Sequence, residues 1–337
     1  MPDFRPSGTG GTTDGGADLE VITIGRVGVD LYPEQIGVSL AEVRTFAKSL
    51  GGSPTNVAVA AARLGHRAAI ITKVGDDPFG TYVRAALGGF GVDARWVGTD
   101  PRHRTPIVFC EIHPPDRFPL LFYREPKAPD LEITASELDL EAIARVPLLW
   151  TCGTALSQEP SRTATLAALA AARRTKIHDL DHRPMFWSSA TEARAAAREA
   201  VAKATIVIGN TEEVEMAVGT AEPDAAAEAL LALGPEIVVV KRGGDGVLAR
   251  TRGGERIVVP PVPVEVLCGL GAGDAFGGAF CHGLLSGWPL ARTLAFANAA
   301  GAIVASRLAC ADAMPTVAEV DTVLAAVRAA GETSAYA

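Results

Sequence analysis

Short apolar runs alternate with longer amphipathic stretches along most of this 337-residue chain. Each run is almost wholly apolar, which is typical of a strand buried on both faces of a sheet. The stretches between the runs are rich in Ala and Leu at helical spacing. Strands are predicted at 20–25, 68–74, 147–153, 176–181, 205–210 and 236–243, and helices at 54–65, 78–89, 136–146, 160–174, 189–203 and 223–233. This alternation predicts an α/β fold in which a mostly parallel central sheet has helices on both faces.

Two segments, 31–50 and 101–130, break the alternation and carry shorter, more polar runs. Proline interrupts the second segment seven times. Because proline within a sheet is found mainly in edge strands, we expect these segments to form a small separate β-sheet. Such a sheet would act as a lid over the carboxyl ends of the parallel strands, where open α/β sheets bind ligands.

The two ends of the chain differ from this body. After residue 273 the pattern turns mainly helical, and helices are predicted at 273–286, 290–307 and 316–330. Residues 1–18 are rich in Gly and Thr and are predicted to be a disordered leader, with a short tail at 331–337. The folded domain is therefore expected to span residues 19–330.

Composition excludes several classes of protein. Lys and Arg number 31 against 39 Asp and Glu, a net charge of −8, whereas sequence-independent nucleic-acid binding needs a basic surface. The five cysteines lie far apart without a CxxC pair, so neither a disulfide framework nor a zinc cluster is expected. No apolar run approaches the roughly 18–20 residues that span a bilayer, and the N-terminus lacks a signal-peptide pattern. We expect a cytoplasmic protein with neither a nucleic-acid nor a membrane partner.

The strongest local signal is the Gly-rich run GLGAGDAF at 269–276, which follows an apparent strand, VPVEVL, at 262–267 and opens a helix. Glycines let backbone N–H groups approach a ligand closely, and a helix N-terminus attracts anions. Asp274 would lie in the first turn beside a bound phosphate, where an ionised carboxylate can take a proton from an attacking hydroxyl. Asp is also a favoured N-cap, so these residues alone leave a general base and a cap open.

Two familiar phosphate-binding motifs are absent from the sequence. The chain has no GxxxxGK[ST], so it is not a P-loop enzyme. The Gly-rich run is not GxGxxG either, because Asp274 stands at the third Gly position and no acid follows about 20 residues later. An NAD-dependent oxidoreductase is therefore disfavoured.

A second Gly-rich turn, Gly51-Gly52-Ser53-Pro54-Thr55-Asn56, opens the helix predicted at 54–65. Paired glycines would let the backbone approach a small polar ligand, and the Asn56 amide could bind hydroxyl groups. A simple turn, with Ser53 as cap and Pro54 at the first helical position, explains everything except Asn56. Asp30, just past the first strand, could also bind hydroxyls or be an ordinary loop acid.

Three further motifs have both a structural and a functional interpretation. Asn210 and Glu213 start a helix and could order the water shell of Mg²⁺, or form a capping box. The segment KRGGDG at 241–246 predicts a hairpin turn that could contact a phosphate. Arg124, in the expected lid, and Arg183 could bind a carboxylate or phosphate if they converge.

Together these motifs resemble the ribokinase-like (PfkB) family of carbohydrate kinases. GGSPTNVAVAAARLG at 51–65 is similar to its N-terminal signature, GLGAGDAFGGAF at 269–280 to its GAGD signature, and NTEE at 210–213 to its Asn-x-x-Glu motif. The resemblance runs from about residue 20 to 330 and implies a ribokinase-like fold and a kinase that uses ATP and Mg²⁺. It further implies that Asp274 is the general base.

The resemblance also implies which residues surround each ligand. The catalytic set comprises Asp274 and the backbone N–H groups of Gly271, Ala272 and Gly273. The substrate set comprises Asp30, Gly51, Gly52, Asn56, Tyr123, Arg124 and Arg183. The nucleotide set comprises Asn210, Lys241, Gly243, Gly246, Gly271, Gly273 and Asn298, while Asn210 and Glu213 would hold Mg²⁺ through water.

Within the family, segments such as GRVGVDLYP and DLDHRPMFW are similar to members that phosphorylate the terminal hydroxyl of a deoxy sugar acid. The resemblance implies that the pair Tyr123-Arg124 and the arginine at 183 contact an acid substrate. An acid substrate needs a cation in its binding site, whereas a neutral sugar does not. Kinases for 2-keto-3-deoxygluconate, fructose or ribose stay open, as does a non-catalytic sugar-sensing module. A homodimer formed through the lid is a further expectation.

One residue departs from the family pattern. The usual Asp-Thr-x-Gly-Ala-Gly-Asp begins here with Cys268-Gly269. In activated members that first Asp helps to hold a monovalent cation, and a thiol is a poor ligand for a hard cation. Activation by K⁺ therefore stays open.

Overall fold

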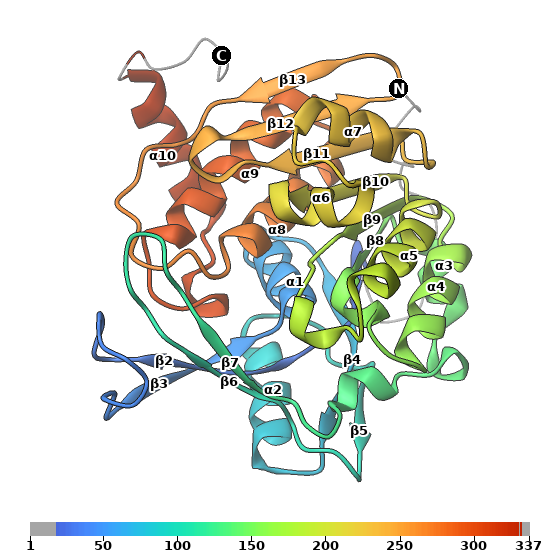
Figure 1. The fold of residues 1–337 in the computed structure, drawn as a ribbon, viewed down its shortest axis with the longest axis vertical. Coiled ribbons are helices and arrows are strands. Elements are labelled where there is room, and N and C mark those ends of the chain that lie inside the picture. The colour runs from blue at the N-terminus through green and yellow to red at the C-terminus, as the bar shows by residue number, and fades with distance from the viewer. Residues whose placement is uncertain (1–17, 330, 332–337) are drawn as a thin grey trace.

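A nine-stranded sheet runs through the computed structural model, which describes residues 18–329 and 331 (Figure 1). The strand order is β13-β12-β11-β10-β9-β8-β1-β4-β5. The strands are β1 Val21–Ile24, β4 Ala68–Gly75, β5 Val97–Asp100, β8 Leu148–Cys152, β9 Thr175–Asp179, β10 Ile206–Asn210, β11 Ile237–Lys241, β12 Val247–Thr251 and β13 Arg256–Val259. The predicted leader and tail lie outside the described residues, apart from Asp18 and Gly331.

In this spatial order, every neighbouring pair from β5 through β4, β1, β8, β9 and β10 to β11 is parallel. The strands β12 and β13 continue the sheet beyond β11 with antiparallel pairing. The six predicted strands are all present, and the predicted hairpin turn joins β11 to β12. The mostly parallel α/β sheet is thus confirmed. Three short strands, β5, β12 and β13, were not predicted, because each carries polar or charged residues and lies at or near an edge of the sheet.

Helices cover both faces of this sheet, and neighbouring residues of one strand pack on opposite faces. Val21 belongs to the apolar cluster that includes α1, α2, α8, α9 and α10, whereas Ile22 packs with α3, α4 and α5. A third cluster joins the β10–β12 region to α5, α6 and α7. The helices are α1 Ser53–Arg63, α2 Pro78–Gly89, α3 Leu140–Arg145, α4 Ser161–Ala171, α5 Ala190–Val201, α6 Thr211–Val218, α7 Pro223–Leu231, α8 Ala272–Leu285, α9 Leu290–Ala305 and α10 Val317–Ala329.

Short 3-10 turns join several of these elements: η1 Pro129–Glu132, η2 Ala135–Glu137, η3 Gly153–Leu156, η4 Pro184–Phe186, η5 Gly243–Asp245 and η6 Ala311–Ala313. One of them corrects a predicted helix. The helix expected at 136–146 begins only at Leu140, because Asp139 accepts a hydrogen bond from the Ala142 N–H and caps a new helix there.

A separate four-stranded sheet, order β3-β2-β6-β7, forms the lid sheet, whose β2–β3 hairpin projects at the lower left of Figure 1. Its strands are β2 Gly28–Pro33, β3 Phe46–Gly51, β6 Ile107–Cys110 and β7 Leu120–Tyr123. They come from the two segments that broke the alternation, although the sheet begins slightly earlier, at Gly28. The parallel pairing of β2 with β6 joins the two segments.

The segment VPVEVL, expected to be a strand, is irregular. Prolines at 260, 261 and 263 remove backbone donors that a sheet would require. Val262 instead packs into the main apolar core, and the N–H groups of Leu267 and Cys268 donate to the Ala305 carbonyl. The Gly-rich run is therefore held against the end of α9 rather than by a strand.

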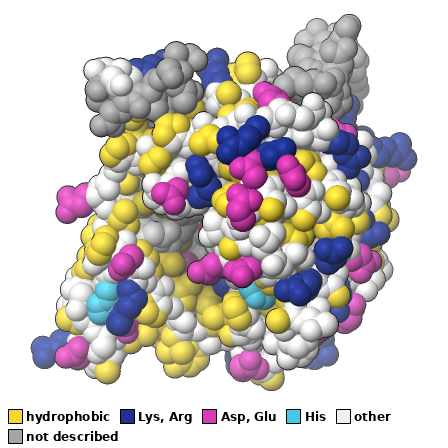
Figure 2. All heavy atoms as spheres, turned by 45° about the horizontal axis from the view of Figure 1, so that its top comes forward, with side chains coloured by type: hydrophobic (Ala, Val, Ile, Leu, Met, Phe, Trp, Pro, Cys, Tyr) yellow, Lys and Arg dark blue, Asp and Glu magenta, His cyan; other side chains and the backbone are white. Residues whose placement is uncertain are grey.

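On the face shown in Figure 2, Lys and Arg side chains are interspersed with Asp and Glu. Among the described residues, Arg250 and Arg256 both pair with Asp224. No helix in the described part of the chain is long and apolar enough to cross a membrane.

Candidate active site

A cavity lies between the lid sheet and the N-terminal end of α8. The lid sheet contributes Asp30, Val108 and Phe122 to its wall, and α8 contributes Asp274. Further wall residues are Arg26, Tyr32, Gly52, Asn56, Leu120, Arg183, Leu270, Gly271 and Cys310. Segments that are distant in sequence thus meet around one polar space, where the strand topology predicted a ligand.

The first turn of α8 has the geometry of an anion-binding nest. Gly271 is the N-cap, with φ 81°, and a Cβ there would lie 2.7 Å from Cys310 Sγ, so glycine is required by both conformation and space. The first N–H groups of α8 have no partner within the helix. Asp274 is the third residue of α8 and not its cap, which removes the capping interpretation of this residue.

Asp274 is half-buried and lines the cavity, and its Oδ2 accepts a hydrogen bond from Asn56 Nδ2 at 2.8 Å. Burial raises the pKa of the Asp274 carboxyl to about 6, although the Asn56 hydrogen bond and the charge of Arg26 oppose this shift. The other amide atom, Asn56 Oδ1, is buried without a hydrogen-bond partner in the described part of the chain. It is an acceptor available to a hydroxyl of a bound ligand.

Asp30 and Gly52, the second of the paired glycines, also line the cavity. A Cβ on Gly51 would lie 2.0 Å from Asp30 Oδ1, so glycine here makes room for the carboxyl group. Gly52, with φ 108°, is the N-cap of α1, so the expected cap, Ser53, is instead the first helical residue. Burial raises the pKa of Asp30 to about 7, while Arg26 opposes the shift.

The predicted nucleotide side contains a buried ionic cluster. Lys241 Nζ lies 3.7 Å from Asp179 Oδ2, and a Cβ on Gly273 would lie 3.3 Å from the same nitrogen. The ammonium group therefore lies beside the anion-binding nest of α8. Burial favours the neutral amine, but Asp179 and Glu213 more than offset it and raise the pKa of Lys241.

Asn210 and Glu213 form the capping box that was one of their two interpretations. Asn210 Oδ1 accepts from the Glu213 N–H at 2.9 Å, and Glu213 Oε2 accepts from the Asn210 N–H at 2.7 Å. Glu213 Oε1 lies 3.7 Å from Arg183 Nη1, too far for a direct hydrogen bond. Burial raises the pKa of the Glu213 carboxyl. A cation bound beside this group would favour its ionised form and lower the pKa.

The remaining nucleotide-set residues have structural partners. Gly243 and Gly246 both have positive φ in the β11–β12 turn, and a Cβ on Gly246 would overlap the Val259 carbonyl oxygen. Asn298 Nδ2 donates to the Pro260 carbonyl at 2.8 Å and ties α9 to the loop after β13. Their contacts with a nucleotide stay predictions.

Tyr123 and Arg124 do not reach the cavity wall in this structure. The alternation of β7 directs Leu120 and Phe122 toward the cavity, so Tyr123 faces away and is 60% exposed. Arg124 Nη2 pairs with the buried Asp130 Oδ2 at 2.7 Å. Of the expected substrate cations, only Arg183 therefore lines the cavity.

The sequence analysis missed three charged residues of the site. Arg26 lines the cavity just after β1, and Asp179 and Asp181 lie at and just beyond the end of β9. Arg26 Nη2 lies 3.5 Å from Asp181 Oδ2. Their position at the carboxyl ends of central parallel strands was the signal that could have identified them.

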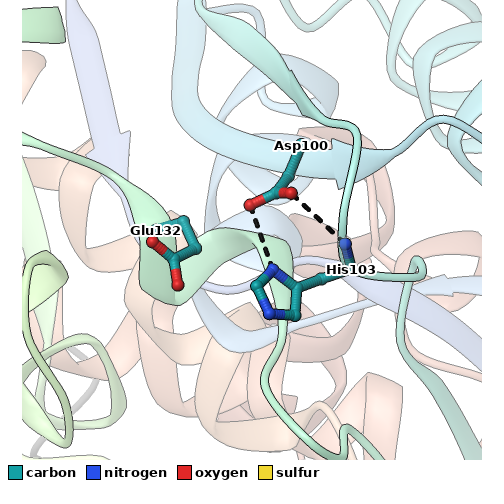
Figure 3. A group of neighbouring side chains, drawn as sticks. All are labelled: Asp100, His103 and Glu132. Carbon is teal, nitrogen blue, oxygen red and sulfur yellow. Dashed lines mark hydrogen bonds and ion pairs between the residues drawn. The ribbon is translucent and has the colours of Figure 1, made fainter.

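A second cluster, Asp100, His103 and Glu132, lies apart from the cavity, near the end of β5 (Figure 3). Asp100 accepts the His103 backbone N–H at 3.2 Å and lies 3.1 Å from its ring Nδ1. Glu132 is paired with Lys127 at 2.8 Å and Arg102 at 3.3 Å. Because these cations already neutralise the carboxylates, we assign no metal to this cluster.

Comparison with known proteins finds relatives that match most of the chain. A family model described as pfkB family carbohydrate kinase matches residues 18–317. The 5-dehydro-2-deoxygluconokinase of Geobacillus thermodenitrificans is 35% identical over 320 residues, covering 93% of this chain and 95% of the relative. That of Shouchella clausii is 36% identical over 311 residues, covering 90% and 95%.

Solved structures show the same ribokinase-like fold. An E. coli protein described as a ribokinase II, in complex with ATP and Mg²⁺, has a TM-score of 0.82 and 25% identity, covering 91% of this chain and 99% of that chain. Fructokinase from Vibrio cholerae, with fructose, ADP and calcium bound, has a TM-score of 0.80 and 28% identity, covering 90% and 99%.

Proposed function

Because the chain belongs to the pfkB family of carbohydrate kinases, we propose that it transfers the γ-phosphoryl group of ATP to 5-dehydro-2-deoxy-D-gluconate, an intermediate of myo-inositol catabolism. The acceptor is the terminal hydroxyl of this sugar acid. Curated relatives of that name, about 35% identical and matched over most of their length, support this choice. The fructokinases among the structural relatives support only the broader class of sugar kinase.

One observation carries the proposed chemistry: Asp274 lies beside both an anion-binding nest and the hydroxyl-binding Asn56. Asp274 takes the proton from the acceptor hydroxyl as its oxygen bonds to the γ-phosphorus. The bond from that phosphorus to the bridging oxygen of ADP breaks, and ADP leaves. The backbone N–H groups of Gly271, Ala272, Gly273 and Asp274 stabilise charge on the transferred group.

The residues near Lys241 fit a magnesium ion held through water. Glu213 Oε1 has no direct hydrogen bond among the described residues, and the buried Asp179 carboxylate lies close to Lys241. Oxygens of this kind accept hydrogen bonds from the water shell that Mg²⁺ retains. When bound, Mg²⁺ neutralises phosphate charge, and Asn210 and Glu213 would orient its waters.

The acceptor contacts follow from the cavity wall. Asp30, Asn56 and the backbone at Gly52 and its neighbour Gly51 bind acceptor hydroxyls, and an arginine of the cavity wall, Arg26 or Arg183, binds its carboxylate. Arg124 is not retained in this role, because its guanidinium is held by Asp130. The lid sheet limits access of water, which would otherwise accept the phosphoryl group.

A coupled ADP-release assay over a panel of sugars and sugar acids tests the proposal. We expect 5-dehydro-2-deoxy-D-gluconate to have the highest kcat/KM, with ADP release lost when EDTA removes Mg²⁺. Preference for 2-keto-3-deoxygluconate or for a neutral sugar would overturn the substrate assignment. We expect no effect of K⁺, because Cys268 is fully buried and burial raises its thiol pKa to about 11, which leaves it uncharged.

The proposal includes a homodimer formed through the lid sheet. The outer face of β7 exposes Leu121 by 48% and Tyr123 by 60%. Tyr123 packs edge-on against Phe109, which packs edge-on against Phe46, so the apolar face extends across the lid sheet. A second copy of the chain would cover this surface.

A further inference from the structure

Arg26 is a cation of the cavity wall whose hydrogen-bonding capacity is largely unused. Its side chain is 11% exposed, and its Nε and Nη2 both lie 3.5 Å from Asp181 Oδ2. A direct guanidinium–carboxylate hydrogen bond is usually about 2.7–2.9 Å long. Nε is buried and has no hydrogen-bond partner in the described part of the chain. Arg26 is therefore attracted to Asp181 electrostatically, and its guanidinium makes no short hydrogen bond with it.

Asp181 is the residue that holds Arg26 at the cavity. Its Oδ2 accepts a hydrogen bond from Thr154 Oγ1 at 2.9 Å, and its Oδ1 lies 3.1 Å from Arg183 Nη2. Asp181 also has φ 27°, an unfavourable backbone conformation of a kind that concentrates at functional sites. Burial alone would raise the pKa of Asp181, but Arg26 and Arg183 lower it below its usual value, so the carboxylate stays ionised.

The two arginines both line the cavity and both pair with Asp181, but their other neighbours differ. Arg183 Nη1 lies 3.7 Å from Glu213 Oε1, on the predicted nucleotide side. Arg26 follows β1, and its charge opposes the rise that burial causes in the pKa of Asp30, the acid of the lid sheet that lines the cavity. Arg26 is thus the cation on the acceptor side.

A neutral sugar would bring Arg26 no anion beyond Asp181, which lies 3.5 Å away. Asn56 and Asp30 supply hydrogen-bonding groups for hydroxyls, so an acceptor that carries only hydroxyls is served without a guanidinium. A carboxylate, by contrast, matches the planar fork of the Arg26 guanidinium, whose Nη2 lies 3.5 Å from Asp181 Oδ2. In the complex with an acid, the acceptor carboxylate then offsets the free energy that it costs to remove the Arg26 guanidinium from water.

We propose that Arg26, held in place by Asp181, binds the carboxylate of the acceptor and thereby selects sugar acids over neutral sugars. This inference rests on the proposed function, since it requires an acid acceptor. It transfers the specificity role from the lid residue Arg124 to a residue that follows the central strand β1.

The test compares kcat/KM for 5-dehydro-2-deoxy-D-gluconate and D-fructose in the wild type, Arg26→Gln, Arg26→Lys and Asp181→Asn. Assays at about pH 8 keep Asp274 ionised, since its pKa is about 6. Arg145→Gln is the matched control, because Arg145 is 72% exposed and pairs only with the exposed Glu141 among the described residues.

We expect Arg26→Gln to lower the ratio of kcat/KM for the acid to kcat/KM for fructose by about 10- to 100-fold. This is the effect of losing a charge-assisted hydrogen bond. Most of the change should appear as a raised KM for the acid. Arg26→Lys should recover part of the ratio, because it keeps the charge and loses the fork. Asp181→Asn should lower the ratio less than Arg26→Gln, and thermal unfolding should show that each variant is folded.

Three results would overturn the inference, and they are distinguishable. An equal loss of kcat/KM with both acceptors in Arg26→Gln, with the wild type preferring the acid, would make Arg26 a general positioning residue and leave the proposed function intact. Unchanged kcat/KM with both acceptors in Arg26→Gln would return carboxylate recognition to Arg183 or to the lid. A wild type that does not phosphorylate the acid would overturn both the inference and the proposed function.

Discussion

The half-buried carboxylate of Asp274 lies between an amide donor and the nest of α8, and substitution by its isosteric amide separates the effect of its charge from that of its shape. We expect Asp274→Asn to lower kcat by at least about 10²-fold, the usual contribution of a general base. Binding of ADP should change little. Steady-state ADP release and calorimetric titration with ADP would measure these two quantities.

The same variant should be more stable than the wild type at pH 8. The folded-state pKa of Asp274, about 6, exceeds its ordinary value of 3.8, so the ionised form is disfavoured by folding and destabilises the protein above pH 6. Glu141→Gln, which changes an 87% exposed side chain, is the control. Near-normal turnover in Asp274→Asn would contradict the base assignment, and a lower Tm would contradict the electrostatic argument.

The pH dependence of kcat/KM reports the same carboxylate. A base must be deprotonated to act, so kcat/KM should fall on the acid side with a midpoint near pH 6, the pKa to which burial raises Asp274. Asn56→Ala removes the hydrogen bond that lowers this pKa, and the midpoint should move to higher pH. Profiles of kcat/KM from about pH 5 to 9 for the wild type and Asn56→Ala check both expectations. A midpoint that does not move in Asn56→Ala would contradict the effect of the Asn56 hydrogen bond on the pKa of Asp274.

The sequence predicted those site residues that carry a local signal. Asp274, Asn56 and Asp30 follow a Gly-rich run or a strand, and the structure gathers all three around one cavity. Arg26 and Asp181 were missed because their pairing joins positions 155 residues apart, and no local pattern marks it. Arg124 lies away from the cavity because it pairs with Asp130 of η1, a contact that no pattern in the sequence indicated.

At the scale of elements, the nest depends on one backbone conformation at the start of α8. Gly271→Ala would place a Cβ 2.7 Å from Cys310 Sγ at a φ of 81°. Gly287, just beyond the other end of the same helix, has φ 68°, and a Cβ there would meet no atom within 4 Å among the described residues. Gly287→Ala is therefore a control for conformational strain alone.

We expect Gly287→Ala to cost about 1–2 kcal/mol in the free energy of unfolding, and Gly271→Ala to cost about 1–3 kcal/mol more, because overpacking is added to strain. Only Gly271→Ala should also lower kcat, since it moves the N–H groups of the nest. Chemical denaturation and turnover measure the two effects. Equal stability losses in the two variants would contradict the packing argument.

Element prediction succeeded where the hydrophobic pattern is strong. The all-apolar runs of the central parallel strands marked β1, β4 and β8 to within two residues, whereas the polar edge strands β12 and β13 gave no such pattern. Tyr123 lies away from the cavity because its neighbour Phe122 occupies the inward position, and successive side chains of a strand point to opposite faces.

At the scale of the whole molecule, the lid sheet has two faces of different character. Asp30 and Tyr32 face the cavity, while Leu121 and Tyr123 on the outer face are exposed. An exposed apolar face on a sheet with open edges favours association with another copy. Because the inner face forms the acceptor wall, association on the outer face would also hold that wall in place.

We expect the wild-type chain to sediment as a dimer at micromolar concentration, and Leu121→Asp combined with Tyr123→Asp to convert it to a monomer. A charge on each of these side chains would be buried without a partner at the interface, which is strongly unfavourable. Leu140→Asp, at a 45% exposed position on α3 away from the lid sheet, should leave the dimer intact. Analytical ultracentrifugation distinguishes the states: a monomeric wild type would contradict the dimer, and a dimer that survives the double substitution would place the interface elsewhere.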